Sequence, residues 1–282
     1  MVSSEIKLPY LNTIGLLRAH HLSPKKGLGQ NFLVDDSALR QILFAAEIKP
    51  EDTVLEVGPG LGHLTRYLAA SAGRVAAVEL DQGLFPALRE VLAGYSNVEL
   101  VQGDILEMDL AGLNLPAGYL VVANIPYNIT GSLIQYLLEV EVKPARLVLT
   151  VQKEVAEAIC ATPGDLSIRA LSVQVYGRPQ VTARILAEAF YPPPDVDSAV
   201  LRIDLYPQPL IPTAQMADFF RLIKAGFSQK RKTLRNSLAG GLGWKPQRTV
   251  ALLQDAEIDP QRRAETLSLT EWERIVKEYT KF

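Results

Sequence analysis

Short apolar runs alternate with amphipathic segments between residues 35 and 160. The apolar runs predict buried strands at 53–57, 74–80, 97–104, 119–123 and 145–152. The amphipathic segments carry apolar residues at helical spacing and predict helices at 35–47, 63–72, 83–93, 132–140 and 153–160. Strands that alternate with helices imply an α/β fold built on an open, mostly parallel sheet with right-handed crossovers.

The pattern changes after residue 170. Three strand-like segments follow with short links between them, at 171–177, 181–186 and 198–206, and we expect an antiparallel edge on the parallel sheet. After the proline-rich stretch 207–212, the periodicity is helical at 215–227, 230–238, 246–253 and 269–279. The sequence therefore predicts an α/β domain over residues 1–207 and a small all-helical domain over residues 208–282.

Composition and charge narrow the class of protein. The chain has 282 residues, of which 48% are hydrophobic, and it contains no apolar run long enough to cross a membrane. Cys160 is the only cysteine, so we expect no internal disulfide and no cysteine-based zinc site. The three histidines lack metal-ligand company, so we expect no metal site, and we expect a cytoplasmic protein without a membrane partner. From Gln208 onward the chain carries 13 Lys and Arg against 8 Asp and Glu, although the net charge of the whole chain is −2. A basic tail on an acidic body favours a polyanionic partner.

A glycine-rich turn follows the first of these strands, in EVGPGLGHLT (56–65). Ligands of open α/β sheets bind at the carboxyl ends of strands near such a turn, where glycine lets the backbone come close to them. The spacing here is Gly58-x-Gly60-x-Gly62, which differs from the G-x-G-x-x-G of dinucleotide-binding proteins. A nicotinamide-dependent oxidoreductase is therefore disfavoured.

Two acidic residues end the next two strands. Glu79 can accept hydrogen bonds from both hydroxyls of a ribose, and Asp104 can accept one from the exocyclic amine of an adenine. An adenosine-containing cofactor without phosphates satisfies both, and S-adenosylmethionine is the economical candidate. The alternative is that the two residues are a helix cap and a solvated loop acid.

The fourth strand ends in Asn-Ile-Pro-Tyr, which contains no strong acid or base. The exocyclic nitrogen of adenine is a poor nucleophile, and its methylation requires acceptors for its two N–H groups. The side-chain oxygen of Asn124 and the carbonyl of Ile125 can supply them, and Pro126 restricts Ile125 to an extended conformation. Tyr127 offers a face for a base to stack on, worth about 1–3 kcal/mol. Positioning and polarisation would then carry the chemistry.

These motifs resemble those of known enzymes. The tetrapeptide resembles the (N/D/S)-P-P-Y-type motif of amino-methyltransferases, and with the glycine turn, Glu79 and Asp104 the chain resembles a Rossmann-like, class I S-adenosylmethionine-dependent methyltransferase. Four further stretches resemble the small-subunit branch of the rRNA adenine dimethyltransferases, the KsgA/RsmA family: KKGLGQNFLVD (25–35), VQKEVAEAI (151–159), FYPPPDVDSAV (190–200) and FSQKRKTLRNSL (227–238).

The resemblance implies roles for individual residues. It places at the cofactor Asn31, Leu33, Gly58, Gly60, Glu79, Asp104 and Asn124. It makes catalytic residues of Asn124, Ile125, Pro126, Tyr127 and Phe190. In this arrangement Phe190, expected on a rigid exposed loop, closes on a flipped-out adenine opposite Tyr127.

A basic run marks the tail. FSQKRKTLRNSL places four cations within two expected helical turns, namely Lys230, Arg231, Lys232 and Arg235. Most charged runs are solvated surfaces, but the place of this run, just past the proline-rich stretch in a chain with a site for a base, favours contact with phosphates. Lys25 and Lys26 are expected to add to the same track.

The family resemblance also implies the reaction. It is transfer of methyl groups to the N6 amines of two adjacent adenines in the 3′-terminal hairpin loop of 16S rRNA, giving N6,N6-dimethyladenosines during small-subunit biogenesis. The partner would be 16S rRNA within a precursor of the small subunit, and we expect a monomer.

Two alternatives stay open. A resistance methylase of large-subunit rRNA shares the tetrapeptide and the glycine turn, but the tail after Pro207 matches the small-subunit branch. A non-catalytic RNA-binding assembly factor would not need to keep Glu79, Asp104 and Asn124.

Overall fold

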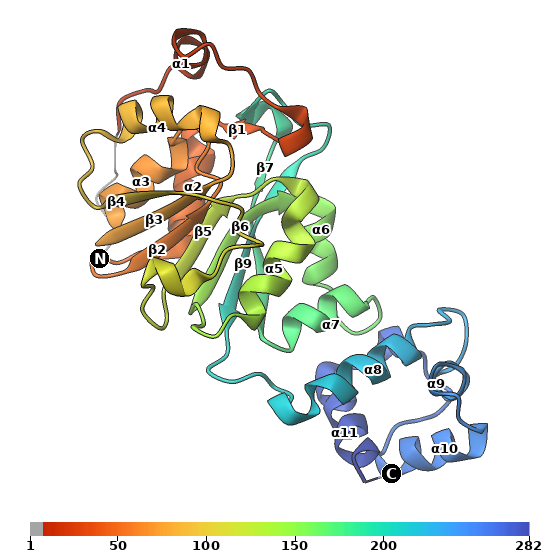
Figure 1. Cartoon of the computed structure of the whole chain (residues 1–282). Coiled ribbons are helices and arrows are strands. Elements are labelled where there is room, and N and C mark those ends of the chain that lie inside the picture. Colours follow the sequence, from red (N-terminus) through yellow and green to blue (C-terminus); the bar gives the residue numbers. More distant parts are fainter. Residues whose placement is uncertain (1–7, 282) are drawn as a thin grey trace. The chain divides into compact units, whose positions relative to one another are not determined.

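The computed structural model describes residues 8–281, which divide into two units (Figure 1). The first unit comprises residues 8–156 and 180–205, and the second comprises residues 157–179 and 206–281. Residues 157–179 thus cluster with the C-terminal segment, whereas the predicted domain 1–207 includes them. Residues 1–7 and 282 of the predicted domains lie outside the described residues. The division into a catalytic and an RNA-binding domain stays a prediction.

A seven-stranded sheet forms the centre of the first unit among the described residues, in the order β4-β3-β2-β5-β6-β9-β7. Its strands are β2 (Thr53–Val57), β3 (Arg74–Glu79), β4 (Val98–Gln102), β5 (Leu120–Asn124), β6 (Arg146–Gln152), β7 (Gly177–Ile185) and β9 (Ser198–Leu205). Neighbours from β4 to β6 pair in parallel, and β9 pairs antiparallel to β6. The predicted mostly parallel sheet with an antiparallel strand toward its edge is confirmed.

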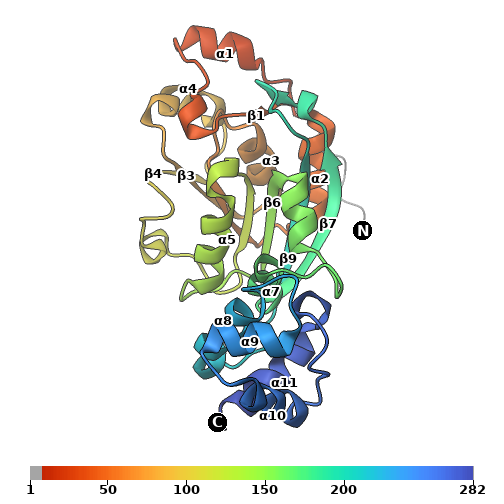
Figure 2. The same ribbon diagram turned by 90° about the vertical axis from the view of Figure 1, so that its right-hand side faces the viewer.

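Helices cover both faces of this sheet, as expected for strands buried along nearly their whole length. Figures 1 and 2 show α2 (Asp36–Ala46) and α3 (His63–Ser71) on the face opposite α5 (Thr130–Glu139). The first unit also contains α1 (Thr13–Ala19), α4 (Phe85–Leu92) and the first residues of α6 (Lys153–Ile159). The side chain of Asp35 accepts from the N–H of Ala38 and caps α2.

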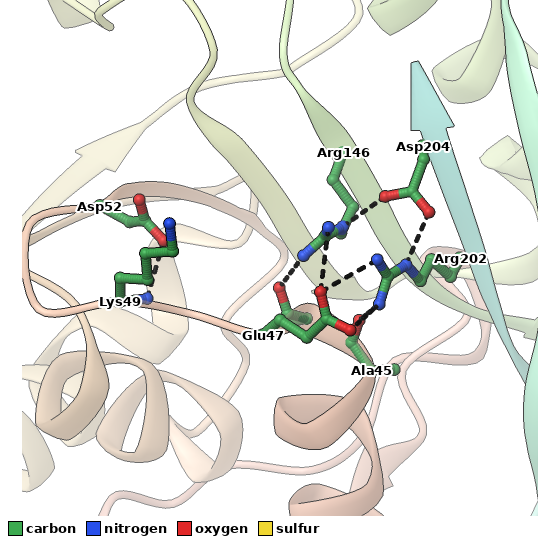
Figure 3. A network of polar contacts seen from close by, with 8 residues as sticks. Ala45, Glu47, Lys49, Asp52, Arg146, Arg202 and Asp204 are labelled. Atoms are coloured by element: carbon green, nitrogen blue, oxygen red, sulfur yellow. Dashed lines mark hydrogen bonds and ion pairs between the residues drawn. The ribbon is translucent and has the colours of Figure 1, made fainter. Parts of the chain in front are cut away.

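A charge network fastens the C-terminal end of α2 to β6 and β9 (Figure 3). Arg146 and Arg202 both donate to the carboxylate of Asp204, at 2.6 and 2.8 Å, and both pair with Glu47. They also donate to the carbonyls of Ala46 and Ala45, which have no partner within the helix. Hydrogen bonding from Arg202 lowers the pKa of Glu47. Burial alone would raise the pKa of Asp204. The hydrogen bonds from the two arginines outweigh this effect, so the pKa of Asp204 is lowered.

Asp204→Asn is expected to lower the free energy of unfolding by about 1 kcal/mol at pH 7, because it removes the ion pairs with Arg146 and Arg202. The loss is small because Asp204 is partly exposed to solvent. The folded pKa of Asp204 lies below its ordinary value of 3.8. Its stabilisation is therefore full above that value and is lost as the pH falls through the lowered pKa. Urea unfolding at pH 7 and pH 3 measures both differences, with the exposed Asp165→Asn as the control. An equal difference at both pH values would contradict the linkage.

A second, two-stranded sheet joins segments that are far apart in the sequence. β1 (Phe32–Leu33) pairs antiparallel to β8 (Phe190–Tyr191), with Leu33 opposite Phe190. The stretch GQNFL therefore lies against the stretch FYPPP, beside the main sheet. This pairing brings together the motif at 25–35, which precedes α2, and the motif at 190–200, which leads into β9.

The second unit contains the helices α7 (Ile168–Gln174), α8 (Met216–Gly226), α9 (Leu234–Leu242), α10 (Pro246–Asp255) and α11 (Leu269–Tyr279). Trp272 and Phe219 are fully buried in its apolar core, to which Leu171 and Val175 also belong. The prediction of helices only after the proline-rich stretch is confirmed for the described residues.

The predicted strand at 171–177 is wrong, since most of it is helix α7. Leu171, Val173 and Val175 alternate like a strand, but Leu171 and Val175 also lie four residues apart and share one buried helix face. Ser167 accepts a hydrogen bond from the N–H of Ala170 and starts the helix. The expected helix from residue 230 also begins later, at Leu234.

Within residues 8–281, no helix combines the length and the apolar character needed to traverse a bilayer.

Candidate active site

A cavity of the first unit lies at the carboxyl ends of β2, β3 and β5. Its lining includes every residue that the sequence analysis assigned to the cofactor or the reaction: Asn31, Leu33, Gly58, Gly60, Glu79, Asp104, Asn124, Ile125, Pro126, Tyr127 and Phe190. These residues come from six separate stretches of the chain, and the fold brings them around one cavity.

The glycine turn after β2 forms one wall of the cavity. Gly58 and Gly60 have φ values of 70° and 60°, which favour glycine over residues with a side chain. The N–H of Gly58 donates to the carbonyl of Val78 at 2.9 Å and thereby ties the turn to β3. A Cβ atom on Gly60 would lie 3.0 Å from the ring of Phe32, so a side chain there would push β1 away.

Glu79 is held by two backbone N–H groups. Gly60 donates to its Oε2 atom at 3.0 Å and Asp81 donates to its Oε1 atom at 2.8 Å. Burial raises the pKa of Glu79, although these hydrogen bonds oppose the increase. A carboxylate has about four acceptor positions, so roughly two remain for the hydroxyls of a ligand.

Glu56 is a residue that the sequence analysis did not assign to the site. It is 1% exposed, it lines the cavity, and its Oε2 atom has no hydrogen-bond partner among the described residues. Burial raises the pKa of Glu56 to about 8. A buried polar atom without a partner costs free energy, and a polar group of a ligand would satisfy it. The signal in the sequence was an acid inside the apolar run TVLEV.

A strap formed by residues 25–31 closes another side of the cavity. Lys25 Nζ and Gln30 Nε2 donate to the two carboxylate oxygens of Asp81, at 2.7 and 2.9 Å. Asn124 Nδ2 donates to the carbonyl of Asn31 at 3.1 Å. The ammonium of Lys25 thus pairs with Asp81, yet its side chain is 54% exposed. Lys26 is exposed as well, and the expected contact of both lysines with RNA stays a prediction.

His63 also lines the cavity and is buried rather than exposed. Its Nε2 atom lies 2.8 Å from the hydroxyl of Thr13 in α1. Burial lowers the pKa of His63 to about 4, so the ring is neutral at pH 7. This interaction ties His63 to the N-terminal helix α1.

The tetrapeptide is oriented by its polar contacts. Because the Nδ2 atom of Asn124 faces the carbonyl of Asn31, its Oδ1 atom is left as an acceptor. The hydroxyl of Tyr127 forms a hydrogen bond of 2.6 Å with Ser198 Oγ. Burial raises the pKa of Tyr127, and the charge of Asp197 adds to the increase. The phenol is therefore neutral at pH 7 and is no base.

Phe190 lies in the two-stranded sheet and is only 3% exposed. The expectation of an exposed loop at Phe190 is wrong, because its pairing with Leu33 buries the ring in the apolar core around α2 and α3. It still lines the cavity that Tyr127 lines. The neighbouring Tyr191 is the exposed aromatic, at 37%.

The basic run belongs to the second unit. Lys230, Arg231 and Lys232 are exposed and lie in the turn between α8 and α9, so they are not on a helix as expected. Arg235 is half-buried in the first turn of α9, where it donates to Asn236.

The parallel sheet, the glycine turn with its paired carboxylate and the Asn-Ile-Pro-Tyr corner together define a Rossmann-like methyltransferase. Solved structures of such enzymes are similar over nearly their whole length. The 23S rRNA methyltransferase ErmE is 28% identical, with a TM-score of 0.72 over 88% of this chain and 99% of that chain. A dimethyladenosine transferase from Plasmodium falciparum is 24% identical, with a TM-score of 0.78 over 89% of this chain and 98% of that chain.

Sequence comparison gives the family. The model of the family described as "Ribosomal RNA adenine dimethylase" matches residues 22–281. A protein named "Ribosomal RNA small subunit methyltransferase A" from Dehalococcoides mccartyi is 46% identical over 94% of this chain and 91% of its own length. Proteins of the same name from Moorella thermoacetica and Enterococcus faecalis are 46% and 41% identical and are similarly covered, at 95% and 92% of their lengths. The chain belongs to the ribosomal RNA adenine dimethylase family and is an rRNA adenine methyltransferase.

Proposed function

We propose that this enzyme uses S-adenosylmethionine to methylate the N6 amines of two adjacent adenines in the 3′-terminal hairpin loop of 16S rRNA. The product would be N6,N6-dimethyladenosine, formed during assembly of the small subunit. The observation that carries the proposal is the cavity in which the Asn124 amide, the Tyr127 ring and the Glu79 carboxylate meet.

The residues present fit the cofactor. Glu79 has acceptor positions left for a ribose, and one carboxylate oxygen of Asp104 holds the N–H of Leu106 while the other can accept from an adenine amine. Gly58 and the Glu56 Oε2 atom, which has no hydrogen-bond partner among the described residues, line the same cavity, and we expect the methionine part to bind beside them. When bound, S-adenosylmethionine supplies an electrophilic methyl group.

The chain's own residues then act by positioning the target amine. Asn124 Oδ1 and the carbonyl of Ile125 accept its two N–H groups and draw the nitrogen toward tetrahedral geometry. Such preorganised acceptors stabilise the transition state without a strong base. The neutral Tyr127 and Phe190 provide aromatic faces for the flipped-out adenine.

The comparisons favour the small subunit as the target. Relatives named for the small subunit are 41–46% identical, whereas the large-subunit enzyme ErmE is 28% identical. These sequence identities support the hypothesis of a small-subunit target, which the tail motif also suggests. A methylase of large-subunit rRNA is the second candidate, because the 23S rRNA methyltransferase ErmE is similar in fold over 88% of this chain.

Replacing Lys230, Arg231 and Lys232 with Ala is expected to weaken RNA binding and to flatten its salt dependence, because each lost phosphate contact reduces the slope of log K against log salt by about 0.7–0.9. Binding to small-subunit RNA at several salt concentrations measures the slope. The control removes equal charge elsewhere in the second unit, at the exposed Lys224, Arg263 and Lys277. An unchanged slope in the first variant would make the basic run a solvated surface.

The target is tested by methyl transfer from labelled S-adenosylmethionine to undermethylated small and large ribosomal subunits, assayed separately. We expect label in the small subunit alone. Label in the large subunit would support the resistance methylase, and cofactor binding without any label would support a non-catalytic factor.

A further inference from the structure

A hydrogen bond links two loops of the site that are distant in the sequence. Tyr127 follows β5, Ser198 begins β9, and their oxygen atoms lie 2.6 Å apart. Ser198 is fully buried and pairs with Gln152 at the carboxyl end of β6. The pairing of β9 with β6 therefore fixes the position of Ser198, and the hydrogen bond holds the Tyr127 ring relative to it.

The chain segment that ends at Ser198 begins at Phe190, the second aromatic of the cavity. Phe190 is fixed by its pairing with Leu33. Just before Ser198, the carbonyl of Asp197 accepts from Lys153 N–H and its side chain accepts from Ala187 N–H, both at 3.0 Å. Both ends of the segment are thus tied to the framework of the first unit.

Stacking on a base requires only the ring of Tyr127, because a phenylalanine ring would stack as well. The hydroxyl is therefore unnecessary for stacking itself. Its partner Ser198 is fully buried, and this part-buried pair of hydroxyls holds the two side chains in one geometry. The group that the bond can orient is the aromatic face of Tyr127 in the cavity.

We propose that Ser198 is a positioning residue for methyl transfer, which acts through the hydroxyl of Tyr127 to set the place of its ring relative to Phe190. This inference rests on the proposed function, in which the two rings receive the target adenine. Ser198, which follows the FYPPP stretch, would thus orient Tyr127, whereas Phe190 contacts the base directly.

The test is a double-mutant cycle of Ser198→Ala and Tyr127→Phe, read as kcat and KM on undermethylated small subunits. Each single change is expected to lower kcat by about 3- to 10-fold, the effect of one buried hydrogen bond. The double variant should lose no more than either single variant, because both remove the same bond. Affinity for S-adenosylhomocysteine, measured by calorimetry, should be unchanged in all three variants.

Ser71→Ala is the matched control. The hydroxyl of Ser71 also forms one part-buried hydrogen bond, which it donates to the carbonyl of Tyr67, but Ser71 lies in α3 and outside the cavity. It should keep wild-type kcat. Losses that multiply in the double variant, or a Tyr127→Phe enzyme with wild-type kcat, would overturn the inference alone. A wild-type protein that methylates no adenine would overturn the proposed function and this inference together.

Discussion

Asn124→Ala is expected to reduce methyl transfer by about 10²–10³-fold, the range seen when one preorganised transition-state contact is removed. The change deletes the Oδ1 acceptor, which the bond from Nδ2 to the carbonyl of Asn31 keeps available. Affinity for S-adenosylmethionine should change little, because Glu79 and the glycine turn stay in place. Single-turnover transfer and calorimetry measure the two quantities on the same protein.

Asn97→Ala is a suitable control for Asn124→Ala. The Asn97 side chain also donates to backbone carbonyls, those of Ala69 and Ala72, but it lies outside the cavity. It should lose stability and keep its turnover. Normal turnover in Asn124→Ala would sink the mechanism, since no other side-chain amide oxygen is assigned to the target amine.

Glu79→Gln is expected to weaken binding of S-adenosylhomocysteine by about 10- to 100-fold, since a hydrogen bond to a charged group contributes about 1.5–3 kcal/mol. In the wild type both carboxylate oxygens accept from the backbone, at Gly60 and Asp81. An amide NH₂ in place of one oxygen would face one of those N–H groups, so the side chain would turn and the ribose acceptors would be lost. Calorimetry measures the affinity.

Glu99→Gln on the neighbouring strand β4 is the matched control, because Glu99 is exposed and pairs with Arg74 outside the cavity. Its affinity for S-adenosylhomocysteine should equal that of the wild type. Equal affinity in Glu79→Gln would mean that the carboxylate only supports the glycine turn, and the assignment of the ribose to Glu79 would fall.

Much of the fold could be predicted because buried parallel strands leave a strong signal. Runs such as TVLEV and YLVVA are apolar on both faces, and the helices between them follow from their spacing. Helix α7 could not be predicted with the same rule. In LSVQVYG the apolar residues fit both periods, and the choice was made by the cap at Ser167 and by burial in the helical core.

Part of the lining could be predicted from local motifs, because the glycine turn, Glu79, Asp104 and the tetrapeptide lie where strands end. Asn31, Leu33 and Phe190 were predicted from the family resemblance instead. The internal contacts of the site could not be predicted, since they join distant segments. The bond from Lys25 to Asp81, the buried Glu56 and the bond from Tyr127 to Ser198 depend on distances that only the folded chain fixes. Lys25 and Lys26 are equivalent in the sequence, yet Lys25 forms an ion pair with Asp81 in the structure, whereas Lys26 is exposed.

Nucleoside analysis of small-subunit RNA tests the central claim most directly. Undermethylated small subunits would be incubated with the enzyme and S-adenosylmethionine, and the 3′-terminal RNA fragment would be isolated and measured by mass spectrometry. We expect N6,N6-dimethyladenosine at two adjacent adenines of that fragment, and none with Asn124→Ala. Methylation of another nucleoside, or of adenines elsewhere in the RNA, would contradict it.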